Sequence, residues 1–392
     1  MKFPYYTFFK TLIIWGVLYF AAVTTISAQQ RKKPASINII LTSDVHFGIK
    51  RQNFRGDTGV YSNKVNAAMI KQMNTVTGLK LPFDKGVGAG SVVNHVDYLS
   101  ITGDIANRMD NGVQTAAASW TQFRKDYSRL KLVAGSGLPA QLLLVPGNHD
   151  ASNSIGFPRT MSPATDPSSM VGIYNLMMKP KVPLTRQTYN YKKNKVNYSR
   201  NIGGVHFMFI TLWPDSAERV WMEKDLATVK SQTPVVIFTH DPPIGDDKHF
   251  SSPVAPNVAA PGNMFEFIVD EHYKEAMTPQ KDQTDVEQLG WVKFLKKHKN
   301  IKAYFHGHSN WNEFYTYRGP DNDVDLPTFR VDSPMKGKFS AKDETKLSFQ
   351  LLSFDPKTLQ LTVRECLWNT RPDDPKQGIV FGQSTTISLR VN

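Results

Sequence analysis

Five short apolar runs in this chain are each followed at once by polar residues such as Asp, Asn or His, and this repetition limits the folds that the chain can adopt. The runs cover residues 37–41, 96–101, 141–145, 235–239 and 301–305. Most are rich in Val, Ile, Leu or Phe and lack polar alternation, which is typical of central strands covered on both faces. The pattern therefore predicts an α/β fold.

Helical periodicity lies between some of these strands and supports that prediction. It covers residues 63–73, 115–130, 217–230 and 284–297. A further apolar run, residues 205–211, adds another buried strand. Near the C-terminus, residues 347–354 and 359–367 are joined by a turn sequence, and residues 379–391 supply one more strand. We expect these last strands to be an antiparallel addition to the main sheets, starting near residue 340, and not an independent domain.

Three stretches have the character of long loops: residues 50–90, 151–201 and 242–281. Each follows one of the polar motifs that end the strands. Long loops in a compact domain are commonly functional or poorly ordered, so we expect these to shape a substrate cleft.

The N-terminal segment has the order of a secretory signal peptide. Its start carries two lysines, residues 11–26 are nearly all apolar and uncharged, and Ser27-Ala28 supplies small residues before a polar stretch. We expect residues 1–28 to be removed and the mature domain, residues 29–392, to be exported to the periplasm or secreted, with no stable membrane span. The alternative is an uncleaved membrane anchor, although the apolar run is at the short end for about 30 Å of hydrocarbon.

Charge and cysteine content narrow the chain's class. Apolar residues make up 40% and charged residues 21% of the 392, which is a globular composition. The net charge of +13 falls by two, to +11, without Lys2 and Lys10, and this balance favours anionic partners. The basic run 296–299 is expected at the exposed C-terminal end of a helix. The single cysteine, Cys366, excludes an intramolecular disulfide, and its strand-like surroundings predict a buried residue and not a nucleophile.

The residues that follow the five strands are suited to binding metal. Loops at the carboxyl ends of strands in open α/β sheets converge on one crevice. The motifs are Asp44-Val45-His46, Gly103-Asp104, Gly147-Asn148-His149-Asp150, His240, and His306-Gly307-His308-Ser309-Asn310. Each motif alone is weak evidence, but the five in order predict one cluster. Hard oxygen ligands mixed with imidazole suit divalent Mn, Fe or Zn.

This series resembles the calcineurin-like metallophosphoesterase superfamily over about residues 37–310. The resemblance implies two mixed β-sheets packed together as a sandwich and flanked by helices, with two divalent metal ions. By resemblance, Asp44, His46 and Asp104 bind the first metal. Asp104, Asn148, His240 and His308 bind the second, so that Asp104 is shared.

The chain departs from the family pattern at its last motif. Most members read Gly-His-x-His, whereas this chain has Asn310 at the final position. An Asn oxygen can ligate a hard cation, and the secreted 5′-nucleotidase branch similarly uses an amide there, so we expect Asn310 to bind the first metal. The alternatives are a weakened first site or ligation by His306, which fits the pattern less well.

The resemblance also implies how a phosphate ester would be hydrolysed. Two close cations lower the pKa of a water molecule, so that hydroxide is available near neutral pH, and they orient the ester for attack. The leaving oxygen needs a proton, and His149 is the family's usual acid. We expect Asp150 to orient the His149 imidazole and raise its pKa.

Substrate contacts are weakly marked in the sequence. Arg108 follows Asp104 closely and could reach a phosphate from the same loop, while Arg55, Arg159, Arg186 and His249 in the long loops are weaker candidates. Purple acid phosphatases carry a Tyr three residues after the shared Asp. Here that position is Asn107, so we do not expect a tyrosinate iron site.

The sequence thus predicts an exported phosphatase or phosphodiesterase acting on a phosphorylated small molecule or lipid. A nuclease on the same scaffold is one alternative, motivated by the positive charge. A non-catalytic binding protein with a degenerate first metal site is the other, motivated by Asn310. The natural substrate and the oligomeric state do not follow from the sequence.

Overall fold

The computed structural model describes residues 36–106, 114–151, 166–246, 249–250, 268–269, 284–374 and 376–391. All of them belong to one compact unit, Ala35–Asn392. The expected signal peptide lies outside the described residues, so its removal stays a prediction. Within the described ranges, no helix is both long and apolar enough to cross a membrane.

The first sheet has six strands in the order β14-β13-β12-β1-β4-β5. The strands are β1 (Ile37–Thr42), β4 (Tyr98–Thr102), β5 (Gln141–Val145), β12 (Ser348–Asp355), β13 (Gln360–Leu367) and β14 (Val380–Ser388). β1, β4 and β5 are parallel neighbours. On the other side of β1, the three C-terminal strands continue the sheet in antiparallel fashion, which confirms their assignment as an addition to a main sheet.

The second sheet also has six strands, in the order β10-β11-β9-β8-β7-β6. The strands are β6 (Tyr198–Ile202), β7 (Val205–Phe209), β8 (Val235–Phe238), β9 (Ile301–His306), β10 (Glu313–Tyr317) and β11 (Leu326–Arg330). The four inner strands are parallel, and the two edge strands β6 and β10 are antiparallel to their neighbours. Both sheets are therefore mixed.

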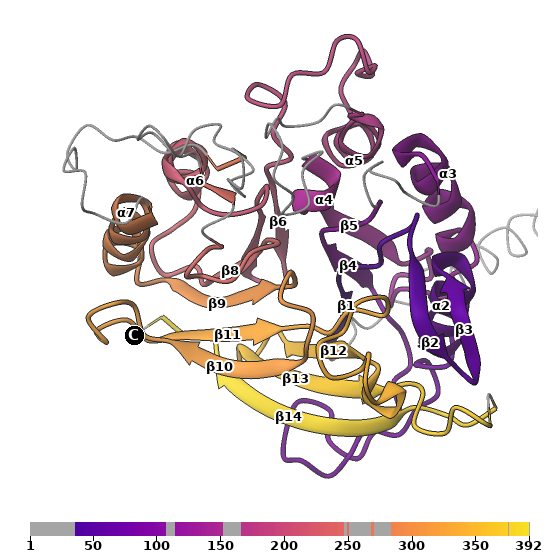
Figure 1. Ribbon diagram of the computed structural model, residues 1–392. Coiled ribbons are helices and arrows are strands. Elements are labelled where there is room, and N and C mark those ends of the chain that lie inside the picture. The colour runs from indigo at the N-terminus through magenta and orange to yellow at the C-terminus, as the bar shows by residue number, and fades with distance from the viewer. Residues whose placement is uncertain are drawn as a thin grey trace, which may run out of the picture. The chain divides into compact units, whose positions relative to one another are not determined.

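Helices lie outside the two sheets, as the strand pattern requires. They are α2 (Ser62–Met73), α3 (Ala116–Tyr127), the short α4 (Asn148–Ala151), α5 (Ser168–Met178), α6 (Ser216–Leu226) and α7 (Thr284–Lys297), with a 3-10 turn η2 (Glu344–Lys346). Figure 1 shows α2, α3 and α5 on the side of the first sheet and α6 and α7 next to the second. Side-chain oxygens of Thr115 and Asp215 cap α3 and α6, which fixes where these helices begin.

Aromatic rings stack across the inner strands of the second sheet. Phe209, Phe238, Phe305 and Phe329 come from the adjacent strands β7, β8, β9 and β11 and are all buried. Successive ring centroids are 5.1, 4.7 and 4.7 Å apart. Such pairs add stability beyond their area burial and fix the register of neighbouring strands.

The observed elements confirm the predicted strands and helices, with ends that differ by a few residues. The prediction that residues 50–90 form a long loop is wrong, because they contain the unpredicted hairpin β2 (Lys50–Phe54) and β3 (Asp57–Tyr61) in addition to α2, which was predicted at residues 63–73. The loop predicted at 151–201 likewise contains α5. Most of residues 242–281 lie outside the described ranges.

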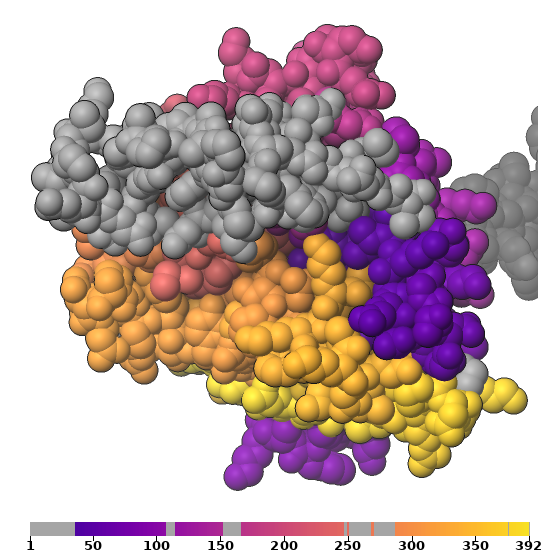
Figure 2. Space-filling model, viewed as in Figure 1, coloured from indigo at the N-terminus to yellow at the C-terminus, as the bar shows by residue number. Residues whose placement is uncertain are grey.

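A turn after α2 covers the outer strands of the first sheet. Figure 2 shows this purple segment below the yellow strands. Its Asp84 carboxylate accepts hydrogen bonds from Nε and Nη2 of the fully buried Arg364, at 2.7 and 2.9 Å. The neighbouring Cys366 is buried, as predicted, and burial raises the pKa of its thiol.

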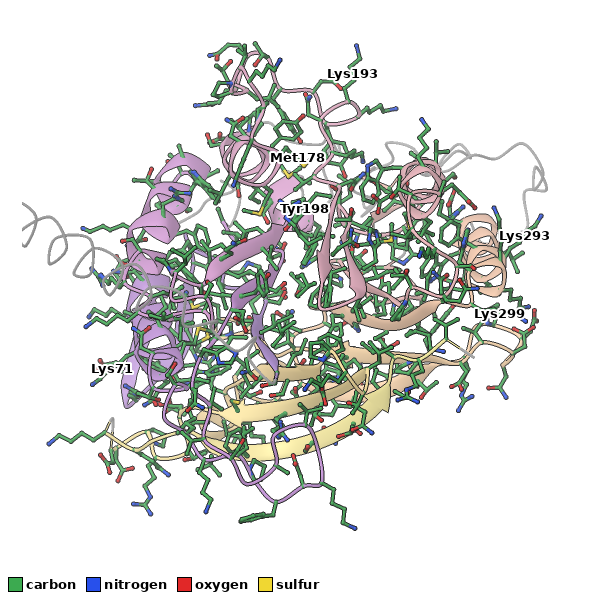
Figure 3. All side chains as sticks on the ribbon, turned by 180° about the vertical axis from the view of Figure 1, so that it is seen from behind. Lys71, Met178, Lys193, Tyr198, Lys293 and Lys299 are labelled. Atoms are coloured by element: carbon green, nitrogen blue, oxygen red, sulfur yellow. The ribbon has the colours of Figure 1, made fainter. Side chains whose placement is uncertain are left out.

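Exposed lysines are spread over the described surface. Figure 3 shows Lys71, Lys193, Lys293 and Lys299 pointing outward from separate elements. At the end of α7, Lys296 and Lys297 are exposed and pair with Asp323 and Glu223, so the basic run there is a helix terminus, as predicted.

Candidate metal centre

The candidate site lies where parallel strands of both sheets end. β1, β4 and β5 lead into the first three motifs, and β8 and β9 lead into the last two. The loops after β1 and β4 stay paired beyond the strands, because the amides of Asp44 and His46 donate to the carbonyls of Gly103 and Asp104 at 3.0 and 2.9 Å. The amide of Gly307 donates to the His240 carbonyl at 3.0 Å, which joins the two loops of the second sheet in the same way.

Several of these loop residues have a left-handed backbone. Asp44, His46, Asp104, His308 and Asn310 have φ between 40° and 63°. This region costs a residue with a Cβ roughly 1–2 kcal/mol, and such strain gathers at functional sites where surrounding structure enforces it. Five strained residues at the ends of three strands therefore lie at the candidate site that the motifs predicted.

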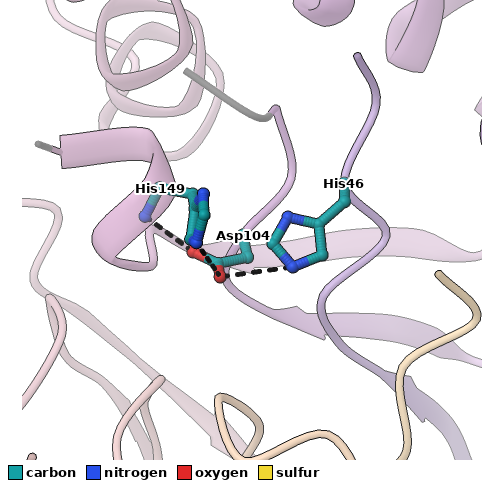
Figure 4. A group of neighbouring side chains, drawn as sticks. All are labelled: His46, Asp104 and His149. Carbon is teal, nitrogen blue, oxygen red and sulfur yellow. Dashed lines mark hydrogen bonds and ion pairs between the residues drawn. The ribbon is translucent and has the colours of Figure 1, made fainter. Parts of the chain in front are cut away.

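The Asp104 carboxylate lies between two groups of side chains. Its Oδ2 faces His46 Nε2 at 3.5 Å and His149 Nε2 at 3.9 Å, as Figure 4 shows. Its Oδ1 faces His240 Nε2 at 3.5 Å and accepts the His149 amide at 2.8 Å. Asp104 is almost fully buried, and its two oxygens face different imidazoles.

The second group contains the residues expected at the second metal. His240 Nε2 lies 3.2 Å from Asn148 Oδ1 and 3.3 Å from His308 Nδ1. His240 Nδ1 lies 2.7 Å from the Thr102 carbonyl, so it carries the proton and leaves Nε2 to act as a ligand. The ligand atoms of Asp104, His240 and His308 therefore lie close enough together to bind one cation, as the prediction requires.

Three residues near His308 were not predicted as part of the metal centre. Asp246 Oδ2 lies 2.8 Å from His308 Nε2, which orients that ring with Nδ1 toward His240. Asp241 Oδ2 lies 2.5 Å from His249 Nδ1, and the His249 ring stands 4.7 Å from that of His308. Asp241 directly follows His240. Asp246 and His249 lie in a stretch with no motif, and His249 was predicted only as a weak candidate for a substrate contact.

Two buried oxygen atoms of the motif residues fit a cation. Asp44 Oδ1 and Asn310 Oδ1 are buried, and neither has a hydrogen-bond partner among the described residues. Asn310 Nδ2 donates to the His308 carbonyl at 2.6 Å, so the amide is held with its oxygen available. Buried oxygens without partners are costly unless something positive meets them, which is the behaviour expected of ligands.

His306 does not join the candidate ligands. Its Nε2 lies 2.9 Å from the Tyr315 hydroxyl and its Nδ1 lies 3.0 Å from the Gly307 carbonyl. Burial and the nearby Arg330 charge lower the pKa of His306 well below its usual value. This histidine is a neutral residue of β9, and Asn310 remains the candidate for the last ligand.

Glycines allow the loops to approach one another. A Cβ at Gly147 would stand 2.3 Å from Asp104 Oδ1, and one at Gly307 would stand 2.4 Å from Asp44 Oδ2. Gly103, with φ +100°, would bring a Cβ within 2.4 Å of His240 Nδ1. The glycine in each of these three motifs is therefore needed because a carboxylate or imidazole occupies the space that any other residue would fill.

Asp150 holds the loops and does not contact the His149 ring in the way that we expected. Its Oδ2 accepts the amides of Ile105 and Gly147, each at 3.0 Å. Its Oδ1 accepts the Ala106 amide at 2.9 Å and the Ser169 hydroxyl at 2.5 Å. Burial and the Asp104 charge raise the pKa of Asp150 to about 6. The three amide hydrogen bonds tie the β4 loop to the β5 loop, and the Ser169 hydroxyl adds α5, so Asp150 is better described as a positioning residue.

A lysine also lies beside the His149 ring. Lys336 Nζ, from the loop after β11, lies 2.9 Å from His149 Nε2. The sequence analysis did not select Lys336, because it belongs to none of the five motifs. Arg108, which it did select, and Asn107 lie outside the described residues.

The electrostatics of the centre favour added positive charge. Burial raises the pKa of Asp44, and the Asp104 charge adds to this effect. Burial would also raise the pKa of Asp104, but the charges of His240 and His46 outweigh it and lower the pKa. Burial alone would lower the pKa of His240, whereas the Asp104 and Asp44 carboxylates raise it. Buried carboxylates and imidazoles that shift one another's pKa in this way fit a site built for metal.

Grouping by distance supports the same conclusion. Two sets of buried ligand atoms that could each hold an ion share Asp104: His46 with His149, and Asp44 with His240. A third set joins His308 with His240 and Asp241. The residues present therefore fit divalent cations in number, type and position.

Comparisons with known proteins agree with this description. The family model described as calcineurin-like phosphoesterase matches residues 37–312, more than half of the chain. No curated protein sequence matches the chain.

Among solved structures, three similar chains illustrate the range. A predicted phosphoesterase from Streptococcus pneumoniae is 9% identical with a TM-score of 0.32, covering 91% of this chain and 99% of its own. Phosphopantetheinyl hydrolase from Mycobacterium tuberculosis is 13% identical with a TM-score of 0.32, covering 77% of this chain and 92% of its own. Vps29 complexed with zinc, from Entamoeba histolytica, is 8% identical with a TM-score of 0.33, covering 90% of this chain and 100% of its own. At these TM-scores the superpositions add nothing to the family match.

Proposed function

Because the chain belongs to the calcineurin-like phosphoesterase family, we propose that it is a metal-dependent hydrolase of phosphate mono- or diesters. The observation that carries this proposal is the Asp104 carboxylate, whose two oxygens face His46 and His240 at 3.5 Å each. A carboxylate shared in this way is the arrangement needed to hold two cations close together.

The residues divide between two cations. Asp44, His46 and Asp104, completed by the Asn310 side-chain oxygen, would hold the first. Asp104, Asn148, His240 and His308 would hold the second. Two divalent ions such as Mn, Fe or Zn, bound there, supply positive charge that lowers the pKa of a water molecule and offsets the charge of the phosphate.

The chain's own residues would then handle the leaving group. His149 Nε2 lies on the Asp104 side of the ring and within 2.9 Å of Lys336 Nζ. We assign to the His149 imidazole the transfer of a proton to the leaving oxygen, a contribution typically worth about 10²–10⁴-fold in rate. The His149 backbone amide donates to Asp104 Oδ1 at 2.8 Å, and this hydrogen bond positions the backbone that carries the ring.

Export of the enzyme is part of the proposal. Export rests on the signal-peptide order of residues 1–28. The net charge of +11 without Lys2 and Lys10 favours phosphorylated small molecules or lipid headgroups as substrates. Intact-mass measurement of the protein recovered from its native compartment would test export, with a new N-terminus at Gln29 as the expected result. Recovery of the full chain in a membrane fraction would favour the anchored form instead.

Hydrolysis of p-nitrophenyl phosphate and bis-p-nitrophenyl phosphate tests the catalytic proposal directly. Activity should depend on added Mn²⁺ and disappear after EDTA treatment. The Asp104→Ala variant should lose both metal, measured by elemental analysis, and activity, because the two oxygens of this carboxylate face the two ligand groups.

The two alternatives predict different results in the same assays. A nuclease, favoured by the positive charge, would show a steep loss of substrate affinity with salt. A binding protein with a degenerate first site, favoured by Asn310, would bind one equivalent of metal and hydrolyse neither ester. Full metal content in Asp104→Ala would contradict the shared-carboxylate assignment itself.

A further inference from the structure

The Asp241 carboxylate is a charged group at the candidate centre to which the hydrolytic proposal gives no role. Asp241 directly follows His240 and is fully buried. One of its oxygens, Oδ2, lies 2.5 Å from His249 Nδ1. The other, Oδ1, is buried and has no hydrogen-bond partner among the described residues. A buried carboxylate oxygen in this situation is costly unless a positive charge meets it.

Asp241 Oδ1 faces the imidazoles that are expected to bind the second cation. It lies 3.9 Å from His308 Nδ1, and the same nitrogen lies 3.3 Å from His240 Nε2. A separation of 3.9 Å is too long for a hydrogen bond. It suits two atoms that bind one cation, because atoms bound at about 2.0–2.2 Å stand at most about 4.4 Å apart. The three side chains also form one of the groups whose ligand atoms could hold a single ion.

Hydrogen bonds fix the backbone that carries Asp241. Its amide donates to the Leu212 carbonyl at 2.9 Å, and its carbonyl accepts the Tyr304 hydroxyl of β9 at 2.9 Å. Leu212 and Tyr304 are both buried, so these contacts belong to the core of the protein. A metal ligand requires rigid support of this kind, because its oxygen must be held close to the position of the ion.

His249 fixes the direction of the Asp241 carboxylate. Its ring contacts Oδ2, and its side chain is almost fully buried. The His249 carbonyl accepts the amides of Ile268 and Val269, each at 2.9 Å, so the backbone of this histidine is held as well. Carboxylates that bind metals are commonly oriented by an outer partner in this way. The contact with His249 thus holds one oxygen and leaves the other directed at His308.

A role in folding alone would account for only one of the two oxygens. The contact with His249 explains the position of Oδ2, whereas no described residue donates a hydrogen bond to Oδ1. Asp44 Oδ1 and Asn310 Oδ1, which are expected ligands of the first cation, are buried without a hydrogen-bond partner in the same way. The three oxygens therefore share the behaviour expected of metal ligands.

We propose that Asp241 Oδ1 is an additional ligand of the second cation and shifts the preference of that site toward Mn²⁺ relative to Zn²⁺. A second carboxylate beside that of Asp104 suits Mn²⁺, which favours oxygen ligands, better than Zn²⁺, which is commonly four-coordinate with nitrogen or sulfur ligands. Zn²⁺ generally binds a given set of ligands more tightly than Mn²⁺, so the quantity to measure is the ratio of the two affinities. The inference rests on the two-cation centre of the proposed function and does not depend on turnover.

The test compares Asp241→Asn with Asp246→Asn. Each replacement removes one negative charge with little change in size. Asp246 contacts His308 at 2.8 Å through Nε2, whereas Nδ1 is the ring atom expected to bind the cation. Its variant therefore controls for lost charge and for the orientation of the ring. Titration calorimetry measures the binding of Mn²⁺ and, separately, of Zn²⁺ to each metal-free protein, after circular dichroism has confirmed that the variant is folded.

The ratio of the two affinities separates a ligand from a residue that acts at a distance. Asp241→Asn should weaken the binding of one Mn²⁺ equivalent by about 100-fold and of the corresponding Zn²⁺ by about tenfold. Asp246→Asn should weaken both by the same factor, because a charge that does not bind the ion acts alike on any divalent cation. An unchanged Zn²⁺ to Mn²⁺ ratio in Asp241→Asn would overturn the proposal.

A crystal structure of the Mn²⁺-loaded wild type tests the same point without a variant. Asp241 Oδ1 should lie within about 2.6 Å of the second ion, as a ligand of a hard cation does. A distance beyond about 3.5 Å would show that the carboxylate does not bind the metal. If the wild type binds two equivalents of Mn²⁺ and hydrolyses neither ester, the hydrolytic proposal fails, while these measurements still decide the role of Asp241.

Discussion

Adding a single methyl group at Gly307 should disconnect the two sheets at the metal centre. A Cβ there would stand 1.9 Å from Ser43 Oγ and 2.4 Å from Asp44 Oδ2, against the minimum of 3.0 Å seen for real contacts. The serine oxygen would have to move by about 1.1 Å and the carboxylate oxygen by about 0.6 Å to reach that minimum. Gly307→Ala therefore tests whether close approach of these loops is required.

The cost can be worked out from the hydrogen bonds that each shift would break. Ser43 can turn away only by losing its bond to the Thr102 carbonyl, 3.0 Å long, worth about 0.5–1.5 kcal/mol. Asp44 can move only by losing the His308 amide, which Oδ2 accepts at 2.9 Å, worth about 1.5–3 kcal/mol because the acceptor is charged. We expect the free energy of unfolding to fall by about 2–4 kcal/mol. Displacement of a ligand carboxylate should also lower turnover by about 100-fold.

Gly378→Ala is the matched control. No atom lies within 4 Å of a Cβ at Gly378, and its φ is outside the left-handed region. That variant should change stability by less than about 1 kcal/mol, with a gain more expected than a loss. Urea unfolding followed by circular dichroism, together with metal content by elemental analysis, compares the two. Wild-type stability and metal content in Gly307→Ala would refute the claim that the two sheets meet through this glycine.

Two further predictions concern the acid and the C-terminal strands. His149→Ala should keep its metal and lose about 10²–10⁴-fold in kcat, measured with p-nitrophenyl phosphate, and activity equal to wild type would remove its role. Asp84→Asn should lower stability by about 3 kcal/mol at neutral pH because it leaves the buried Arg364 unpaired. Burial of Asp84 opposes its ionisation, but hydrogen bonds from Arg364 and Ser384 outweigh this and lower its pKa. The stability that Asp84 contributes is thus present above its unfolded-state pKa of about 4 and is lost as the pH falls below that value. The free energy of unfolding in urea should therefore depend less on pH in Asp84→Asn than in the wild type under acid conditions. The same pH dependence in both proteins would contradict the pairing.

Much of the site could be predicted because its positions are set locally. Asp44, Asp104 and His240 each follow a buried strand directly, and the ends of parallel strands meet at one edge of a sheet. Where the strand is recognised from its composition, the placement of the next few residues follows without knowledge of the fold. The same reasoning failed for residues 50–90, where polar side chains on the hairpin β2–β3 concealed two short strands.

Roles that depend on a partner from elsewhere could not be assigned in the same way. Asp150 was expected to orient His149 because the two are adjacent, but its oxygens accept amides of the β4 loop instead. The ring of His149 contacts Lys336, which arrives from β11. Adjacency in the chain does not determine which atoms a side chain meets, because neighbouring residues point in different directions.

The sequence by itself determined the strands, the order of the five motifs and the residue types suited to divalent cations, since each of these follows from local composition. Only the tertiary structure decided that the two oxygens of Asp104 face separate imidazole groups, that Asp246 orients His308, and that Lys336 reaches His149. These contacts join residues from different strands, loops and sheets. Their geometry arises from how the two sheets pack together and how their loops hydrogen-bond across the junction, and no local pattern encodes that packing.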